Sequence, residues 1–299
     1  MREAWLYIVA GVLCALLLGA LLWMMHAASR NATTPVATSP APAVDTAPTT
    51  AMPKVEKVGV STEGRAIELY RFGTGSTAVL FVGGIHGGYE WNSVALAYEA
   101  IDHLKACPTC VPDELSVLIV PVLNPDGMAL VLGDSTREAL AYAPSDRDAA
   151  APGRFNAREV DLNRNFDCKW QPSATWRGQA VSAGTAAFSE VEAQVLRDVV
   201  LREQPRAVVF WHSKAGAVYA SECEEGVLPE TLAITRAYAT AANYRAVEQF
   251  DAYPVTGDAE GWLASIGIPA ITVELETHDS AEWERNRRGV EALLQYYAQ

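Results

Sequence analysis

Short apolar segments alternate with helical patterns from residue 78 to residue 297, and this alternation constrains the fold more than any other feature. Apolar runs bounded by turn signals are typical of buried strands, because a strand covered on both faces needs no polar alternation. We predict such strands at 78–82, 115–122, 207–211 and 269–275. We predict helices at 91–104, 189–203, 232–242 and 281–297, the second opened by a capping box of Ser189 and Glu192. The order predicts an α/β fold with a mixed, largely parallel central sheet flanked by helices.

The segment 5–25 carries no charge and precedes this fold. As a helix rising about 1.5 Å per residue it spans roughly 31 Å, close to the thickness of a bilayer core. Trp5, Tyr7 and Trp23 lie near its ends, as interfacial aromatic residues do. We expect an uncleaved single transmembrane helix; a cleaved signal peptide and a buried core helix are the alternatives. The short flank before the segment favours a large C-terminal part outside the cytoplasm, in the periplasm or at the cell surface.

Residues 26–53 are predicted to be an extended linker, because a segment composed mainly of Ala, Thr and Pro cannot bury a hydrophobic core. The predicted organisation is therefore an N-terminal flank and membrane anchor (1–25), a linker (26–53) and one domain (54–299). The chain has 36 acidic and 23 basic residues, a net charge of −13, with the basic residues scattered. This charge argues against a nucleic-acid partner, which needs a basic face.

Two histidines and one glutamate follow predicted strands. His86 and Glu90 come after the strand at 78–82, and His212 ends the strand at 207–211. Functional side chains gather at the carboxyl ends of strands in such sheets, and two imidazoles with one carboxylate form a common catalytic zinc site. The alternative is that each histidine is an ordinary residue at the sheet edge with its own hydrogen-bond partner.

Two further segments contain polar or charged residues that suggest a function. Asn163 and Arg164 lie in the segment 160–166 (VDLNRNF), which is either a polar loop or a clamp for a carboxylate, since a guanidinium binds carboxylates through two hydrogen bonds. Glu274 lies inside the apolar strand 271–275, where an acid is costly unless it has a function or an ion-pair partner.

Taken together, these motifs resemble the zinc carboxypeptidases of the carboxypeptidase A type. The resemblance covers residues 54–299 in order: His86 and Glu90, the turn 124–127 (NPDG), the segment 161–165 (DLNRN), His212 with Ser213, and Glu274 with Leu275. The residues before and within 160–165 are most similar to the bacterial branch that includes murein peptide amidases.

The resemblance implies a set of roles for the site. His86, Glu90 and His212 would hold one Zn²⁺, and Asp161 would orient His86. Glu274 would take a proton from the attacking water and pass it to the leaving amine, and Arg154 would stabilise the carbonyl oxygen as it becomes negative. The substrate residues would be Asn163, Arg164, Tyr253 and Glu260: the first two hold the terminal carboxylate, Tyr253 closes over the substrate, and Glu260 favours a cationic side chain. For Glu260 the alternative is a solvent-facing residue at the start of a short helix.

One spacing departs from the family, which usually has two residues between the histidine and the glutamate. Three residues separate His86 from Glu90. A loop containing Gly87 and Gly88 can accommodate the extra residue and still present both ligands; otherwise zinc binding would be weakened or lost.

The cysteines suggest an oxidising compartment. Cys107 and Cys110 form a C-x-x-C segment between a helix and a strand, which favours a local disulfide over a redox or zinc motif. Cys168 and Cys223 would then pair; the sequence leaves the other two pairings of the four open.

The predicted function is a membrane-anchored zinc metallocarboxypeptidase that cleaves the C-terminal amide bond of peptides with a free C-terminal carboxylate, cell-wall peptides among them. Two alternatives remain at this stage. One is an N-acyl amino acid deacylase of the succinylglutamate desuccinylase and aspartoacylase type, and the other is a carboxypeptidase-like binding domain without metal.

Overall fold

The computed structural model describes residues 19–20, 22–26, 52–250 and 254–299. Residues 19–20 and 22–26 are helical and form part of a first unit, which ends at Ala47. Among the described residues, no helix is both long enough and apolar enough to cross a membrane. Most of the predicted transmembrane segment 5–25 and of the linker 26–53 lies outside the described residues, so these two assignments stay predictions.

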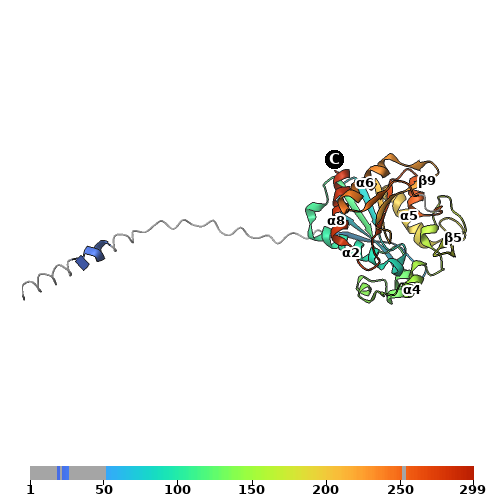
Figure 1. Ribbon diagram of the computed structural model, residues 1–299, viewed down its shortest axis with the longest axis horizontal. Helices are drawn as coiled ribbons and strands as arrows, with labels where there is room; N and C mark the ends of the chain where they lie inside the picture. The colour runs from blue at the N-terminus through green and yellow to red at the C-terminus, as the bar shows by residue number, and fades with distance from the viewer. Residues whose placement is uncertain (1–18, 21, 27–51, 251–253) are drawn as a thin grey trace, which may run out of the picture. The chain divides into compact units, whose positions relative to one another are not determined.

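The second unit is built on an eight-stranded sheet with the order β1-β2-β4-β3-β7-β12-β8-β11 (Figure 1). The strands are β1 (Lys54–Val60), β2 (Ala66–Phe72), β3 (Thr77–Val82), β4 (Leu115–Val120), β7 (Ala207–Ser213), β8 (Ala217–Ala220), β11 (Arg245–Val247) and β12 (Ala270–Leu275). The central neighbours β4, β3, β7 and β12 are all parallel, whereas β1, β2 and β8 join their neighbours antiparallel at one or both edges. The mixed, mostly parallel sheet predicted from the sequence is thus confirmed.

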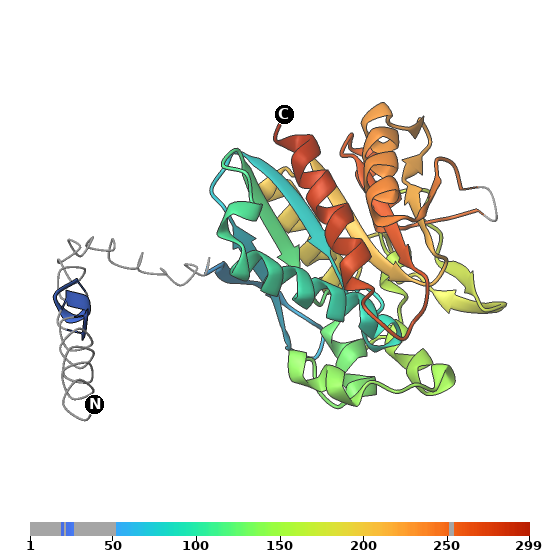
Figure 2. The same ribbon diagram turned by 60° about the vertical axis from the view of Figure 1, so that its left-hand side comes forward.

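Helices cover both faces of this sheet. The helices are α2 (Trp91–Ala106), α3 (Pro125–Leu132), α4 (Arg147–Ala150), α5 (Val191–Glu203), α6 (Pro229–Ala242), α7 (Ala259–Ser265) and α8 (Trp283–Tyr297). One hydrophobic core joins the sheet to α2, α6 and α8, and a second joins it to α5 and α7. Figure 2 shows α8 lying across the first of these faces.

Side-chain alternation on the two central strands decides which groups meet at the site. On β7, Val209 and Trp211 belong to the α2/α6/α8 core, and Val208 and Phe210 belong to the α5/α7 core. His212 therefore continues the α5/α7 row, because alternate residues of a strand share a face. On β12, Val273 and Leu275 belong to the first core, which leaves Thr272 and Glu274 on the same side as His212.

Several elements differ from the prediction. The sequence analysis did not identify β1, β2, β8 or β11, nor the hairpin of β5 (Ser173–Trp176) and β6 (Gln179–Ser182) within the segment that looked irregular. The predicted capping box is wrong: α5 has Glu190 as its N-cap. The Ser189 hydroxyl donates to the Glu190 carboxylate, and Glu192 accepts from the backbone N–H of Thr62 instead of closing the box.

Both predicted disulfides are present. Cys107 is bonded to Cys110, and Cys168 is bonded to Cys223. The second bridge joins the segment after Arg164 to the small strand β9 (Glu222–Cys223), and the Cys168 sulfur would lie 3.1 Å from a Cβ added at Gly261 of α7. It thus fixes the loop that carries Asn163 and Arg164 beside α7.

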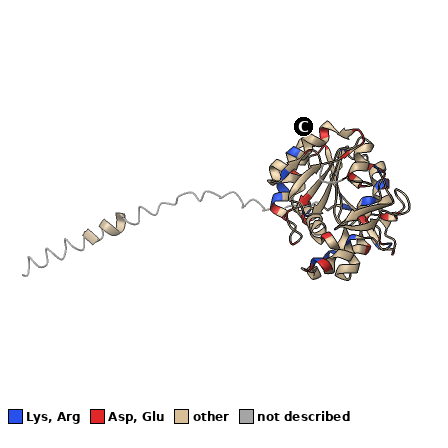
Figure 3. Cartoon of the chain, turned by 45° about the vertical axis from the view of Figure 1, so that its right-hand side comes forward, with Lys and Arg blue, Asp and Glu red and all other residues tan. Residues whose placement is uncertain are grey.

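Charged residues of both signs are interspersed over the face of the domain seen in Figure 3.

Candidate metal centre and active site

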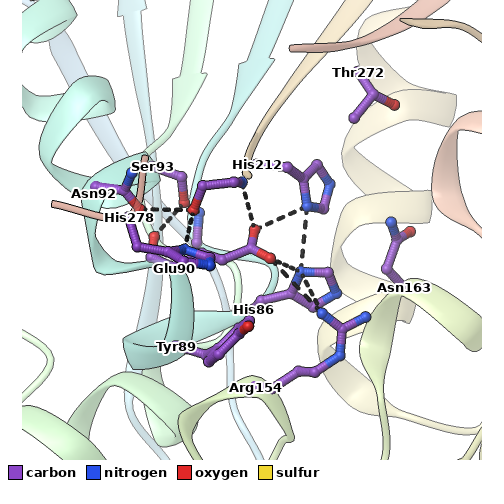
Figure 4. Close-up of polar contacts among 12 residues, drawn as sticks. His86, Tyr89, Glu90, Asn92, Ser93, Arg154, Asn163, His212, Thr272 and His278 are labelled. Atoms are coloured by element: carbon purple, nitrogen blue, oxygen red, sulfur yellow. Dashed lines mark hydrogen bonds and ion pairs between the residues drawn. The ribbon is translucent and has the colours of Figure 1, made fainter. Parts of the chain in front are cut away.

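The three predicted metal ligands converge at the carboxyl ends of β3 and β7. The Nδ1 atom of His86 lies 2.9 Å from Glu90 Oε1, the Nδ1 atom of His212 lies 3.0 Å from Glu90 Oε2, and the two Nδ1 atoms lie 3.2 Å apart (Figure 4). All three residues are buried. Their ligand atoms lie within 4.8 Å of one another, so this group can hold a metal ion.

The extra residue between His86 and Glu90 is taken up by a 3-10 turn, η2 (Gly87–Glu90). The backbone N–H groups of Tyr89 and Glu90 both point to the carbonyl oxygen of His86, so the two ligands lie one turn apart. Gly87 has φ +41°, and a Cβ there would lie 2.7 Å from the carbonyl oxygen of Gly153. The tight turn therefore depends on a glycine, and it presents both ligands despite the unusual spacing.

The Nε2 atom of each ligand histidine lies near a carboxylate. His86 Nε2 lies 3.3 Å from Asp161 Oδ1, and His212 Nε2 lies 3.3 Å from Glu260 Oε1. Each Nε2 thus faces a carboxylate within ion-pair distance, which favours the tautomer with hydrogen on Nε2 and a lone pair on Nδ1. Arg154 agrees with this tautomer of His86: its Nη1, which can only donate, lies 3.3 Å from His86 Nδ1.

This arrangement fits a divalent cation. Two Nδ1 lone pairs and the Glu90 carboxylate face one another at about the length of a hydrogen bond, and acceptors at this distance repel one another. A divalent cation bound by the three groups, or a proton on an imidazole, relieves this repulsion. Burial lowers the pKa of His212, but the Glu90 and Glu260 carboxylates outweigh burial and raise that pKa well above its usual value. Two imidazole nitrogens and a carboxylate are the ligands that catalytic zinc prefers, so the residues present suit Zn²⁺.

Glu274 lies beside this group. It is the register partner of His212 on the neighbouring parallel strand, and its Oε2 atom is buried without a hydrogen-bond partner among the described residues. Burial raises the pKa of Glu274 to about 7, and the negative charges of Glu90 and Glu260 contribute to this rise. A carboxyl group with a pKa near neutrality can both accept and return a proton at physiological pH.

Arg154 is held next to the ligands by Asp161. The Nε and Nη2 atoms of Arg154 lie 2.9 Å and 2.8 Å from Asp161 Oδ2. Burial alone would raise the pKa of Asp161, but Arg154 and His86 hold it well below its usual value. Asp161 thus joins the predicted oxyanion group to a predicted ligand, a link that the sequence analysis did not identify.

The predicted carboxylate clamp lies on the other side of the ligands. Asn163 Oδ1 accepts a hydrogen bond from the backbone N–H of Ala259 at the start of α7. The Nη1 atom of Arg164 donates a hydrogen bond to the carbonyl oxygen of Asn163. Figure 4 shows Asn163 and Thr272 to one side of the His86–His212 pair, and Tyr89 and His278 to the other. Tyr253 lies outside the described residues, so its closing role stays a prediction.

Glu260 is neither solvent-facing nor free. Its side chain is buried, and Oε1 accepts from the Thr272 hydroxyl as well as lying near His212. Its Oε2 atom is buried and has no hydrogen-bond partner in the described chain. The alternative of an exposed residue is therefore wrong, and the preference for a cationic side chain stays a prediction.

A polar network that the sequence analysis missed supports the ligand loop. The Ser213 hydroxyl donates to Asn92 Oδ1, and His278 Nδ1 lies 2.7 Å from the same hydroxyl oxygen. The backbone N–H of Ser213 also donates to Glu90 Oε2. Only the position of Ser213 beside His212 could have signalled this in the sequence, because Asn92 and His278 come from distant segments.

Comparison with known proteins agrees with this geometry. A family model described as zinc carboxypeptidase matches residues 49–286. The chain belongs to the zinc carboxypeptidase family. Carboxypeptidase B of Helicoverpa zea is 28% identical over 243 residues, which cover 72% of this chain and 56% of that protein. Murein peptide amidase A of Escherichia coli (strain K12) is 26% identical over 213 residues, 68% of this chain and 73% of that protein.

Solved structures show the same fold. The murein-tripeptide amidase of Escherichia coli O157 superposes with a TM-score of 0.57 and 20% identity, covering 85% of this chain and 96% of that one. The carboxypeptidase A of Helicoverpa armigera gives 0.58 and 21%, covering 83% of this chain and 68% of that one. The chain spans about half the length of the two carboxypeptidase B relatives, at 56% and 52%.

Proposed function

We propose that this chain is a zinc-dependent carboxypeptidase that hydrolyses the C-terminal amide bond of peptides with a free C-terminal carboxylate. The convergence of His86, Glu90 and His212 beside Glu274, whose Oε2 has no hydrogen-bond partner among the described residues, carries the proposal. Zinc held by the three ligands would activate a water molecule and polarise the scissile carbonyl group at neutral pH.

The chain's own residues would perform the remaining steps. Glu274 takes a proton from the attacking water and gives it to the leaving amine, as its pKa of about 7 allows. Arg154, fixed by Asp161, donates to the carbonyl oxygen as negative charge develops there. Asn163 and Arg164 hold the terminal carboxylate, which restricts cleavage to the end of a peptide.

The test separates metal binding from catalysis in the full-length chain, purified in detergent. We expect one zinc per chain by elemental analysis and much less in Glu90→Ala. Glu274→Gln should keep its zinc and lose about 10²–10⁴-fold in peptide hydrolysis, the usual contribution of a general base. A wild-type chain that holds no zinc after zinc is supplied would refute the proposal and favour a binding domain without metal.

We propose peptides of the cell wall as substrates, because the relatives include proteins named as murein peptide amidase and as γ-D-glutamyl-L-diamino acid endopeptidase. A terminal residue with a cationic side chain would suit the unpartnered Oε2 of Glu260. Peptides that end in Lys and in Phe test this preference. Equal rates would remove it.

We also propose that residues 5–25 anchor the chain in a membrane and that the catalytic domain lies outside the cytoplasm. The uncharged segment and the two disulfides support this location, since disulfides persist in oxidising compartments. Alkali extraction of membranes, followed by protease digestion of intact and opened cells, tests the topology. Release of the chain by alkali would contradict the anchor.

A further inference from the structure

A group of arginine and aromatic side chains lies beside the metal ligands, and the proposed mechanism uses only one of them. We name this group the arginine–aromatic rim: Tyr89, Arg147, Arg154, Trp176 and Arg177. The Tyr89 and Trp176 rings meet edge to face at 5.0 Å between centroids. Three guanidinium carbons lie over these rings: Arg147 at 4.5 Å from the Tyr89 centroid, and Arg154 and Arg177 at 4.9 Å and 5.0 Å from that of Trp176.

The rim is assembled from three separate parts of the chain. Tyr89 belongs to the ligand turn η2, Arg147 opens α4, Trp176 is the last residue of β5, and Arg177 lies in the turn that joins β5 to β6. Each of the three guanidinium groups thus lies within cation–π distance of a ring. The long segment between α3 and α5 therefore places several arginine side chains beside the metal ligands.

The positive charges of the rim are not all balanced within the chain. Arg154 is paired with Asp161, and Arg177 lies 3.0 Å from Asp148, a carboxylate whose side chain is 90% exposed. Within the described part of the chain, Arg147 donates a hydrogen bond to the carbonyl oxygen of Tyr89 alone. Its Nε and Nη1 atoms are buried and have no hydrogen-bond partner among the described residues. Buried donors without an acceptor are costly and rare, which points to an acceptor supplied from outside the chain.

Tyr89 of the rim lies across the ligand histidines from Asn163 of the proposed carboxylate clamp. Tyr89 directly precedes the ligand Glu90 and its ring lies 5.1 Å from that of His278. In Figure 4, Tyr89 and His278 lie on one side of the two ligand histidines, and Asn163 lies on the other. A peptide whose terminal carboxylate were held by Asn163 and Arg164 would therefore pass the metal ligands in the direction of Tyr89.

We propose that the arginine–aromatic rim binds a carboxylate on the acyl side of the scissile bond, so that the preferred substrates are acidic peptides. The polarity of the bound peptide rests on the proposed function. Arg147 and Arg177 are the positioning residues of this subsite: their planar N–H groups match a carboxylate, and the rings exclude water from one face of each guanidinium.

The experiment compares two N-blocked tripeptides that share their first and last residues and carry Glu or Gln in the middle. Binding to full-length Glu274→Gln loaded with zinc is measured by calorimetry, which needs no hydrolysis. We expect the Glu peptide to bind about tenfold more tightly than the Gln peptide at low salt, and this ratio to shrink at high salt. Adding Arg147→Gln and Arg177→Gln should bring the ratio close to one.

A matched control comes from α5. Arg197 also lies over an aromatic ring, 5.2 Å from the Phe188 centroid, and also pairs with an acid, Asp198. Arg197→Gln should keep the tenfold ratio. Arg177→Gln alone, at an exposed turn, should lower the ratio in part, which guards against a folding defect of the Arg147 variant.

Equal affinities in the parent, no binding of either peptide, or a ratio that survives the double substitution would overturn the subsite. Hydrolysis of the two peptides by the wild-type chain is measured separately. A binding preference without hydrolysis of either peptide would reject the proposed function and leave the subsite standing.

Discussion

The unusual spacing of His86 and Glu90 makes a sharp prediction at Gly87. In Gly87→Ala the new Cβ would lie 2.7 Å, 2.8 Å and 2.9 Å from three backbone atoms, of Gly153, Met128 and Asn124. Backbone atoms cannot move aside as a flexible side chain can. Alanine at φ +41° also adopts a left-handed conformation, which costs about 1–2 kcal/mol.

The expected magnitude is the sum of these two effects. Overpacking in a tight region costs about 1–3 kcal/mol, so Gly87→Ala should lower the free energy of unfolding by about 2–5 kcal/mol. The same strain should move His86 away from Glu90 and weaken zinc binding by at least tenfold. Urea denaturation of the zinc-free chain gives the first quantity, and competition with a chelating dye gives the second.

Gly133 is a matched control, because it has φ +84° and a Cβ there would meet no atom within 4 Å. Gly133→Ala should cost only the conformational part, about 1–2 kcal/mol, and leave zinc affinity unchanged. If Gly87→Ala costs no more than Gly133→Ala and binds zinc as the parent does, the glycine turn is not what accommodates the extra residue.

Two further predictions concern stability. Replacing both cysteines of the Cys168–Cys223 bridge by Ser should lower the free energy of unfolding by about 4 kcal/mol, because this bridge joins residues 55 positions apart. The same replacement at the Cys107–Cys110 bridge, which joins residues 3 positions apart, should lower it by about 2 kcal/mol. Denaturation without reductant measures both losses, and equal losses would contradict the loop-length argument. Burial, together with the positive charge of Arg147, lowers the pKa of His278 to about 4. Between about pH 6.5 and pH 4 the unfolded chain therefore binds more protons at this residue than the folded chain does. The free energy of unfolding should fall as the pH drops through this range. Denaturation across that pH range should show a flatter slope in His278→Gln, and an unchanged slope would contradict this assignment.

The sequence predicted the central strands of the sheet well and its edge strands poorly, because the two groups of strands differ in burial. Strands β3, β4 and β7 are buried on both faces, and β12 is buried on one face and half-buried on the other, so all four appear as predominantly apolar runs. The edge strand β1 (KVEKVGV) mixes charged and apolar residues without clear alternation, because it is only partly buried. The β5–β6 hairpin is similarly exposed and was hidden in a segment without periodicity.

The site shows a similar division. The residues of the metal group could be predicted because they follow strand ends in an order that matches a family. The contact between Glu260 and His212 could not be predicted, because it depends on how α7 packs against the neighbouring strand β12. The rim is likewise invisible in the sequence, since Tyr89, Arg147 and Trp176 meet only through tertiary packing.

The parallel pairing of β3 with β7 has a consequence for the order of events during folding. His86 and His212 are separated by 126 residues and are brought together only when these two strands pair. Long-range parallel pairing forms slowly, because a long loop must close before any contact is gained. A metal ion therefore finds no complete set of ligands in the nascent chain. The ion enters a finished scaffold, and the sheet, not the ion, determines when this protein becomes able to bind it.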